Sequence, residues 1–190
     1  MPSFDLRGIK VAKYVNTNGT VTYTDATTLG DAMNVSMSLR FAEGRLYAES
    51  SLAEYIRKAT GGSISIGVKY IKDEAQKLMF GMTEKSRSVS SKTVKGLAYG
   101  AKAGMSYVGV AFYAPDMIDG VEKYTCVKIS RALFGPPDMA YNTAGESIQF
   151  NTPTTTGEFL ADNSTDQNMF EVAVLDSAAE ATSWITEVLK

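Results

Sequence analysis

Few residues of this 190-residue chain could carry out acid–base, nucleophilic or metal chemistry. The chain has no histidine and a single cysteine, Cys126, so the commonest general base and the usual zinc and Cys-His sites are missing. Asp116, Asp119 and Glu122 stand close together, but an Asp-Gly turn accounts for them. We therefore expect no enzymatic activity, no metal and no cofactor. A carboxylate pair brought together only by folding stays open, because sequence spacing does not reveal it.

The glycines and the charges exclude further classes of site. Three glycines spaced by four match neither a dinucleotide-binding fingerprint nor a Walker loop: Gly96, Gly100, Gly104. With 19 basic and 21 acidic side chains the net charge is -2, which is not the electrostatic footprint of a nucleic-acid binder. The chain has no signal-peptide pattern and no apolar run of about 18 residues. We expect one domain, without a membrane partner and with Cys126 reduced and buried.

The stretch from Ala32 to Ser50 is the organising element of the chain. Polar residues alternate there with a row of apolar ones: Met33, Val35, Met37, Leu39, Phe41. This period of two predicts a long strand with one buried face. Glu43-Gly44 breaks the alternation, and the extended pattern resumes at Arg45. The stretch therefore predicts a hairpin that reverses at residues 43–44.

Further strands follow from turn signals and alternation. Asn18-Gly19 favours a tight turn and predicts an N-terminal hairpin. Alternating patterns predict strands over residues 63–70, 107–114, 121–131, 146–152 and 154–161. The strand after residue 121 should stop at Gly135-Pro136-Pro137, because proline cannot donate to a ladder. Together these segments predict a mainly β fold.

Helix signals occur at three places. Asp73 and Glu74 in a first turn, with Gly81 as a stop, predict a helix on the sheet. Residues 169–175 predict a strand, and residues 176–190 an amphipathic helix with a capping box. Its apolar stripe, which is expected to pack on its own sheet, is formed by Ala178, Ala181, Trp184, Ile185, Val188 and Leu189. Residues 52–60 admit two interpretations, a short capped helix and an extended segment.

A polar, basic segment covers residues 83–104. It contains Lys85, Arg87, Lys92, Lys95 and Lys102, with no acid after Glu84. It predicts a long flexible loop, and loops of this length are uncommon in compact domains unless they are functional or disordered. Two uses stay open: ordering against a neighbouring subunit, and a plain exposed excursion.

Several of these patterns together resemble the major tail proteins, or tail-tube subunits, of long-tailed bacteriophages. The resemblance covers residues 8–161 and rests on the order and spacing of weak motifs. They are the strand and turn leading to Leu46-Tyr47-Ala48-Glu49; residues 61–66, 72–75, 78–81, 106–114 and 121–131; the Asp119-Gly120 turn; and Ser147-Ile148-Gln149-Phe150 leading to residues 154–157. Residues 162–190 depart from the pattern, because many relatives end before this segment.

The resemblance implies a β-sandwich or barrel flanked by a helix. It implies subunits that form rings, usually of six, stacked into a tube through which genome DNA passes without specific binding. The implied partners are further copies of the chain and the tape measure, tail-tip and tail-terminator proteins. The implied location is the virion tail, with the host cytoplasm as the place of assembly.

Two sets of candidate site residues follow for a tube subunit. The candidate lumen or ring interface is the polar face of the central hairpin, with Asn34, Ser36, Ser38, Glu43 and Glu49. The candidate ring-to-ring contact is the 83–104 loop, with Lys85, Arg87, Lys92 and Lys95. A surface that is neutral or acidic would let DNA slide.

A second hypothesis is a monomeric β-domain that binds sugar or peptide through surface aromatics. Its candidate residues are Tyr47, Tyr55, Tyr107 and Tyr113. The two hypotheses differ in what they predict about association. A binding domain should be a discrete monomer with a concave pocket, whereas a tube subunit should form rings or tubes as its concentration rises.

Overall fold

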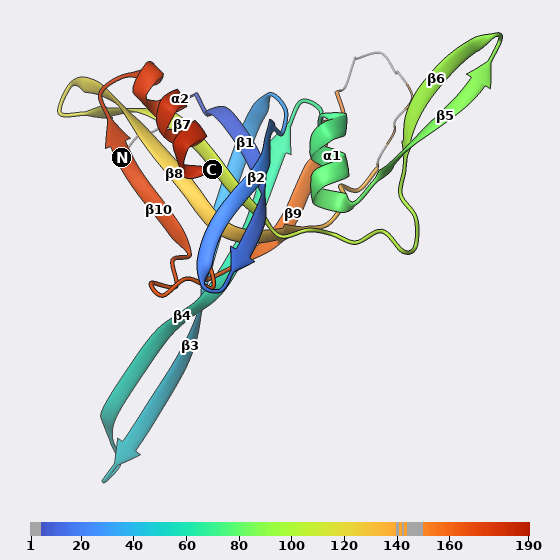
Figure 1. The fold of residues 1–190 in the computed structure, drawn as a ribbon. Coiled ribbons are helices and arrows are strands. Elements are labelled where there is room, and N and C mark those ends of the chain that lie inside the picture. The colour runs from blue at the N-terminus through green and yellow to red at the C-terminus, as the bar shows by residue number, and fades with distance from the viewer. Residues whose placement is uncertain (1–4, 140, 142, 144–149) are drawn as a thin grey trace.

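The computed structural model of the chain is mainly β and β-sandwich-like, with a helix at its C-terminus (Figure 1). It describes residues 5–139, 141, 143 and 150–190. The elements are β1 Arg7–Thr17, β2 Thr20–Thr28, β3 Ala32–Ala48, β4 Ser51–Val68, α1 Asp73–Phe80, β5 Thr83–Val89, β6 Lys92–Ala98, β7 Val108–Ile118, β8 Val121–Phe134, β9 Thr154–Leu160, β10 Phe170–Leu175 and α2 Ala178–Val188.

Eight of the strands form one antiparallel sheet. Seven of them follow the order β2-β1-β7-β8-β9-β4-β3, and the eighth, β10, pairs with β8 outside this order. The long strand β8 pairs with two strands, β10 and β9, along one of its sides. Its first half pairs with β10, from Tyr124 opposite Leu175 to Ile129 opposite Phe170, and its last four residues pair with β9. Strands β5 and β6 form a separate two-stranded sheet. Within the described part of the eight-stranded sheet, β2, β3 and β10 each pair on one side only and so are its edges.

The main core lies inside the curve of the sheet and is closed by α1. Apolar side chains from β1, β4, β7, β8 and β9 meet there with Met79 and Phe80 of the helix. Because β4 and β1 lie near opposite ends of the strand order yet share this core, the sheet folds over on itself. Gly81 ends α1 in the left-handed conformation at φ 66°, as the sequence predicts.

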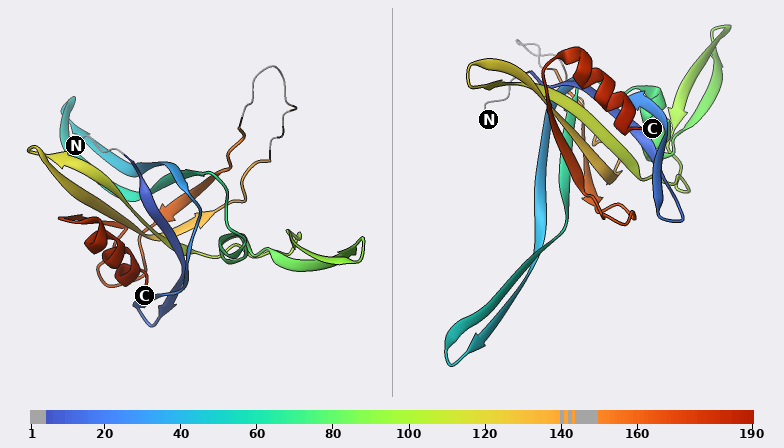
Figure 2. Two further views of the ribbon diagram at one scale, coloured as in Figure 1. Left: turned by 90° about the horizontal axis from the view of Figure 1, so that it is seen from above. Right: turned by 60° about the vertical axis from the view of Figure 1, so that its left-hand side comes forward.

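A second, smaller core lies on the opposite face of β1, β7 and β8, beneath α2 (Figure 2). Ala181 and Ile185 are buried there, and the predicted capping box is present: Ser177 Oγ accepts from the Glu180 backbone N at 3.2 Å, and the Glu180 carboxylate accepts from the Asp176 backbone N at 3.2 Å. This confirms that the helix packs on its own sheet.

Strand β7 is covered on both faces. Val108 and Val110 point into the main core, whereas Ala111 and Tyr113 point into the core beneath α2. Cys126 of the neighbouring strand is buried in that second core as well, and burial raises the pKa of its thiol to about 11. The thiol is therefore un-ionised at neutral pH.

Two predictions about local structure are wrong, and the structure decides an alternative that the sequence left open. The chain does not reverse at Glu43-Gly44: β3 runs through both residues, and the turn lies at Glu49 and Ser50. Residues 52–60 are part of β4, so the extended interpretation holds and the helical one does not. The predicted loop at 83–104 is largely the β5–β6 hairpin. Most of the predicted 146–152 strand and of the Ser147–Phe150 motif lies outside the described residues.

Candidate assembly surfaces

Strands β3, β4 and β9 build a polar surface on the side of the sheet away from the main core. Val35 and Leu39 pack on the core, so the alternate residues of β3 point outward. Ser36 of β3 pairs with Ser65 of β4, which pairs in turn with Thr156 of β9. In the next row, Ser38 pairs with Ser63, which pairs with Glu158. We call this surface the hydroxyl face; its residues are Asn34, Ser36, Ser38, Ser63, Ser65, Thr154 and Thr156.

Charge is confined to the border of the hydroxyl face. There the Arg40 guanidinium and the Glu158 carboxylate form an ion pair at 2.8 Å. The predicted residues Asn34, Ser36 and Ser38 all lie on this face and are exposed. The half of the hydroxyl face on β4 and β9 is not predicted from the sequence. The alternation in β4 is visible, but no local pattern indicates which strands are neighbours.

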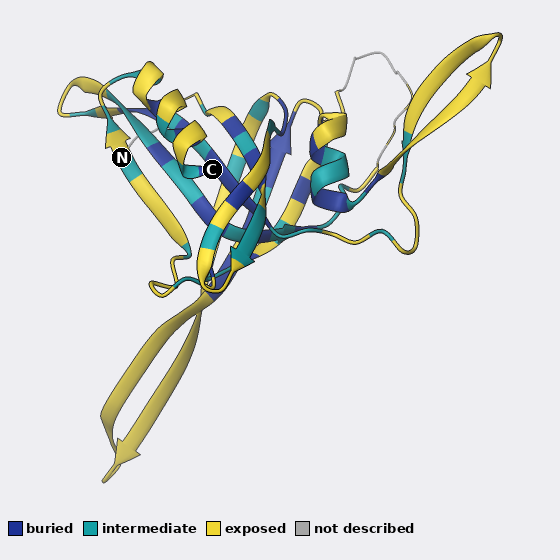
Figure 3. Ribbon diagram, viewed as in Figure 1, coloured by how far each residue is buried: buried dark blue, intermediate teal, exposed yellow. Residues whose placement is uncertain are grey.

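The distal halves of β3 and β4 leave the body as a projecting arm. We call residues 40–60 the β3–β4 arm. Every one of them is exposed (Figure 3), including five large apolar side chains that are 46–61% exposed: Leu46, Tyr47, Leu52, Tyr55 and Ile56. Glu43 and Glu49, predicted to share a surface with Asn34, belong to this arm and not to the hydroxyl face.

One face of the arm carries a row of ionic and aromatic contacts. Glu43 bridges Arg57 at 3.3 Å and Arg45 at 3.6 Å. The Arg57 guanidinium lies 3.9 Å from the centre of the Phe41 ring, and that of Arg45 lies 5.5 Å from the Tyr55 ring. The hydrogen bond with Glu43 raises the pKa of Tyr55. All of these contacts except Glu43–Arg45 join β3 to β4, and none of them ties the arm to the body.

The β5–β6 hairpin is a second projection, and its two faces differ. Directly paired residues lie on one face of a hairpin. Arg87 pairs with Val94, and Val89 with Lys92, so one face carries three cations and two valines. We call it the basic face; its residues are Lys85, Arg87, Val89, Lys92 and Val94. In the described part of the chain these three cations form no ion pair.

The opposite face of the hairpin is tied to the body at its base. The Glu84 carboxylate accepts from Lys77 of α1 at 2.7 Å and from Lys95 of β6 at 2.8 Å. Hydrogen bonding to Lys77, and then to Lys95, lowers the pKa of Glu84 to about 2. Glu84 therefore holds the hairpin to α1 through Lys77, whereas Lys95 joins β6 to β5 through the same carboxylate. Lys95, predicted to share a contact with Lys85, Arg87 and Lys92, lies away from the basic face.

We expect Glu84→Gln to loosen the β5–β6 hairpin without unfolding the body. The folded pKa of Glu84 lies below its ordinary value of 4.5, so its contribution is complete above pH 4.5 and is lost as the pH falls through about 2. Backbone order parameters of β5 and β6 from ¹⁵N relaxation should fall in the variant at pH 6.5 and change little in α1. Unchanged order in the hairpin would show that the Lys77 and Lys95 contacts do not hold it.

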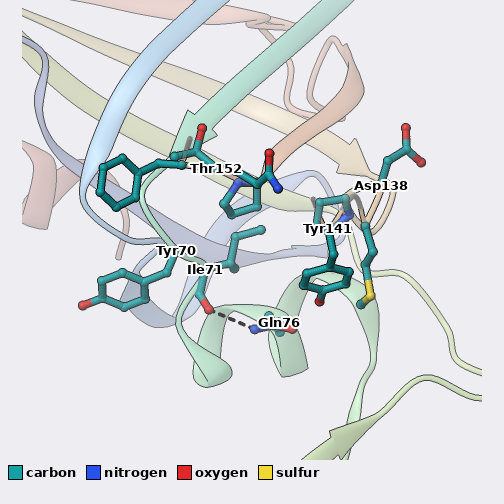
Figure 4. Close-up of a pocket in the computed structure, with 11 residues that line it drawn as sticks. Tyr70, Ile71, Gln76, Asp138, Tyr141 and Thr152 are labelled. Atoms are coloured by element: carbon teal, nitrogen blue, oxygen red, sulfur yellow. Dashed lines mark hydrogen bonds between the residues drawn. The ribbon is translucent and has the colours of Figure 1, made fainter. Parts of the chain in front are cut away.

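An apolar pocket of about 500 Å³ opens beside α1 (Figure 4). Tyr70, Ile71 and Tyr141 lie around it with Phe150 and two prolines. Inside it the Gln76 side-chain amide donates to the Ile71 carbonyl at 2.9 Å. The four tyrosines proposed for ligand binding do not line this pocket: Tyr47 and Tyr55 lie on the arm, Tyr107 stacks with Arg131, and Tyr113 is buried beneath α2.

The acidic residues near the β7–β8 turn do not converge on a site. Asp116 pairs with Lys123 and Met117 with Glu122, so Asp116 and Glu122 point to opposite faces of the sheet. Asp116 is buried, and its Oδ2 accepts from the Thr125 hydroxyl. Within the described ranges, no three Asp, Glu or Cys side chains lie close enough to hold a metal ion.

Neither helix among the described residues is long and apolar enough to cross a bilayer. The surfaces that the fold leaves open are thus the hydroxyl face, the two hairpins and the three edge strands. No family model matches the chain, and no curated protein sequence is significantly similar to it.

Proposed function

We propose that this chain is the structural subunit of a tube of the phage-tail type, in which rings of the subunit stack into a conduit for DNA. The observation that carries the proposal is the pair of hairpins that leave the body. All residues of the β3–β4 arm and residues 83–96 of β5–β6 are exposed. A protein that functions as a monomer has no need to hold two such hairpins in solvent.

The exposed β3–β4 arm is unfavourable for an isolated chain. An isolated two-stranded hairpin is marginally stable at best in water, and large apolar side chains such as Leu46 and Ile56 gain nothing from projecting. A neighbouring subunit would bury these side chains and stabilise the arm at the same time. The arm is therefore best explained as a contact element whose partner is another chain.

The sheet offers complementary surfaces for such contacts. Edge strands β2, β3 and β10 leave backbone groups free to pair with a neighbour. Strand β10 has no lysine or proline to block pairing, and its Phe170, Val172 and Val174 are exposed. Pairing between edges of successive copies would join their sheets into one closed surface.

The hydroxyl face is our candidate for the lining of the tube. Its residues are neutral and short, all but the half-buried Ser65 are exposed, and the Arg40–Glu158 pair at its border is self-compensated. DNA binds proteins mainly through phosphate contacts with Lys and Arg. A surface without free cations would thus let the duplex pass without holding it.

Negative-stain electron microscopy of the purified chain across a concentration series tests the proposal, with light scattering on the same samples. We expect rings or hollow tubes that become more abundant as concentration rises. Cysteines introduced at the exposed positions Ser36 and Ser63 should react with a small maleimide in the monomer and be protected from a bulky one in tubes. Only monomers at all concentrations, also in the presence of a tail-tip complex, would contradict the proposed function.

The pocket beside α1 favours a second candidate function, the binding of a small ligand or a peptide side chain. Its aromatic lining and its volume of about 500 Å³ are typical of such sites. Thermal-shift measurements with oligosaccharides and short peptides test this function. Saturable stabilisation that is lost in Tyr70→Ala, in a chain that stays monomeric, would favour it over the tube.

A further inference from the structure

The charges of the chain are separated between two distant segments. Residues 83–104 contain five basic side chains and one acidic one, whereas residues 162–189 contain six acidic side chains and no lysine or arginine. Figures 1 and 2 place the corresponding elements at opposite ends of the molecule, with β5–β6 at one end and β10 and α2 at the other. The basic hairpin therefore does not reach the acidic segment of its own chain.

The acidic segment and the β7–β8 turn together form one surface. We call it the acidic end; its exposed residues are Asp119, Glu122, Glu171, Asp176, Glu180 and Glu187. Glu122 lies two residues before Tyr124, and Glu171 two residues before Ala173, and both Tyr124 and Ala173 pack beneath α2. Because residues two apart on a strand share a face, Glu122 and Glu171 lie on the face of the sheet that carries the helix. The acidic end is thus a single surface built from β8, β10 and α2.

The remaining charges of the acidic end do not cancel within the chain. Asp176 pairs with Lys123, and Glu187 with Lys190. Glu171 stands directly opposite Lys128 of β8, so its charge is partly balanced within the chain. Three other acids form no ion pair in the described part of the chain: Asp119, Glu122 and Glu180. They match the three uncompensated cations of the basic face.

The two surfaces also match in their apolar content. Val89 and Val94 stand among the cations of the basic face, 55% and 51% exposed. Met117, 45% exposed, stands directly opposite Glu122 on the acidic end. A contact between the two would bury these side chains within a rim of opposite charges, which is the usual arrangement of a specific interface.

We propose that the basic face of β5–β6 in one copy docks on the acidic end of a second copy, head to tail. The proposal rests on the proposed function for the identity of the partner. Because the two surfaces lie at opposite ends of one molecule, each copy keeps one of each surface free to bind the next. Such a contact propagates, and it closes into a ring when the rotation between copies allows.

Charge reversal on the basic face tests the proposal. The variant Lys85→Glu, Arg87→Glu, Lys92→Glu should raise the concentration needed for assembly at least about tenfold, because like charges then face each other. The matched control Ser86→Glu, Ser88→Glu, Thr93→Glu adds acid to the opposite face of the same hairpin and should assemble like the wild type. Circular dichroism checks that both variants are folded.

Rescue makes the test specific. Adding Glu122→Lys to the reversed hairpin restores an opposite charge at the contact and should recover part of the lost assembly. Glu171 is left unchanged, because a lysine there would face Lys128 on the neighbouring strand. Assembly of the reversed variant at the wild-type concentration would overturn the inference. So would a control that fails as badly as the reversed variant, or a combined variant that recovers nothing.

Cross-linking tests the same contact without requiring tubes. Copies carrying Arg87→Cys and copies carrying Glu171→Cys should form dimers with a short bismaleimide when mixed, and neither should when alone. Cys126 is buried and does not compete. If the wild type never assembles, the proposed function fails, whereas absence of the mixed dimer overturns the docking inference by itself.

Discussion

Replacing residues 42–58 with an Asn-Gly dipeptide should abolish assembly while the body stays folded. Phe41 and Ala59 are direct cross-strand partners, so a two-residue turn can close the shortened hairpin between them. The deleted residues are all exposed and add nothing to either core. We expect a change of less than about 1 kcal/mol in the free energy of unfolding, measured by urea denaturation, and no rings or tubes by electron microscopy.

A matched control changes only the turn of the arm. Glu49 and Ser50 both have positive φ, 50° and 64°, a conformation that Asn and Gly adopt more readily. Glu49→Asn with Ser50→Gly should therefore keep the arm and preserve assembly. If the shortened chain still forms tubes like those of the wild type, the arm is not a contact element and the main argument for assembly is lost.

Phe159→Ala should have the largest effect on stability, about 3–5 kcal/mol less free energy of unfolding. Phe159 is fully buried on β9, the strand that joins β8 to β4. Its ring lies where a side chain at Gly62 would be, since a Cβ there would come within 2.3 Å of the ring. Removing the ring therefore leaves a cavity at the point where the two halves of the sheet meet.

Denaturant unfolding below the assembly concentration measures this effect. Phe150→Ala removes the same ring from a position that is 87% exposed and should change the free energy of unfolding by less than about 0.5 kcal/mol. A loss below about 1 kcal/mol for Phe159→Ala would mean that β9 does not join the two halves of the sheet as described.

Local patterns predicted the elements whose two faces differ in environment. Alternation identified the body half of β3, because Val35 and Leu39 meet the core while Ser36 and Ser38 meet solvent. The capping box predicted α2, because its hydrogen bonds join residues within one turn of the helix. In both cases the pattern that predicts the element lies within a short stretch of the sequence.

Prediction failed where neither face of a strand is buried. Glu43-Gly44 looked like a turn, but cross-strand pairs such as Glu43 with Arg57 carry β3 to residue 48. The same pairing overrides the helix-cap signal after residue 51. In β5–β6 nothing is buried from residue 83 to residue 96, so hydrophobicity has no period there and a hairpin looks like a loop.

The sequence by itself determined the chemistry that this protein lacks and the side chains that share a face. The absence of histidine follows from composition alone, and the segregation of serine from isoleucine along β4 follows from the geometry of a strand. Only the tertiary structure decided that Ser36, Ser65 and Thr156 form one row, and that the basic and acidic segments lie at opposite ends. These arrangements depend on contacts between residues far apart in the chain, which the packing of the whole sheet selects.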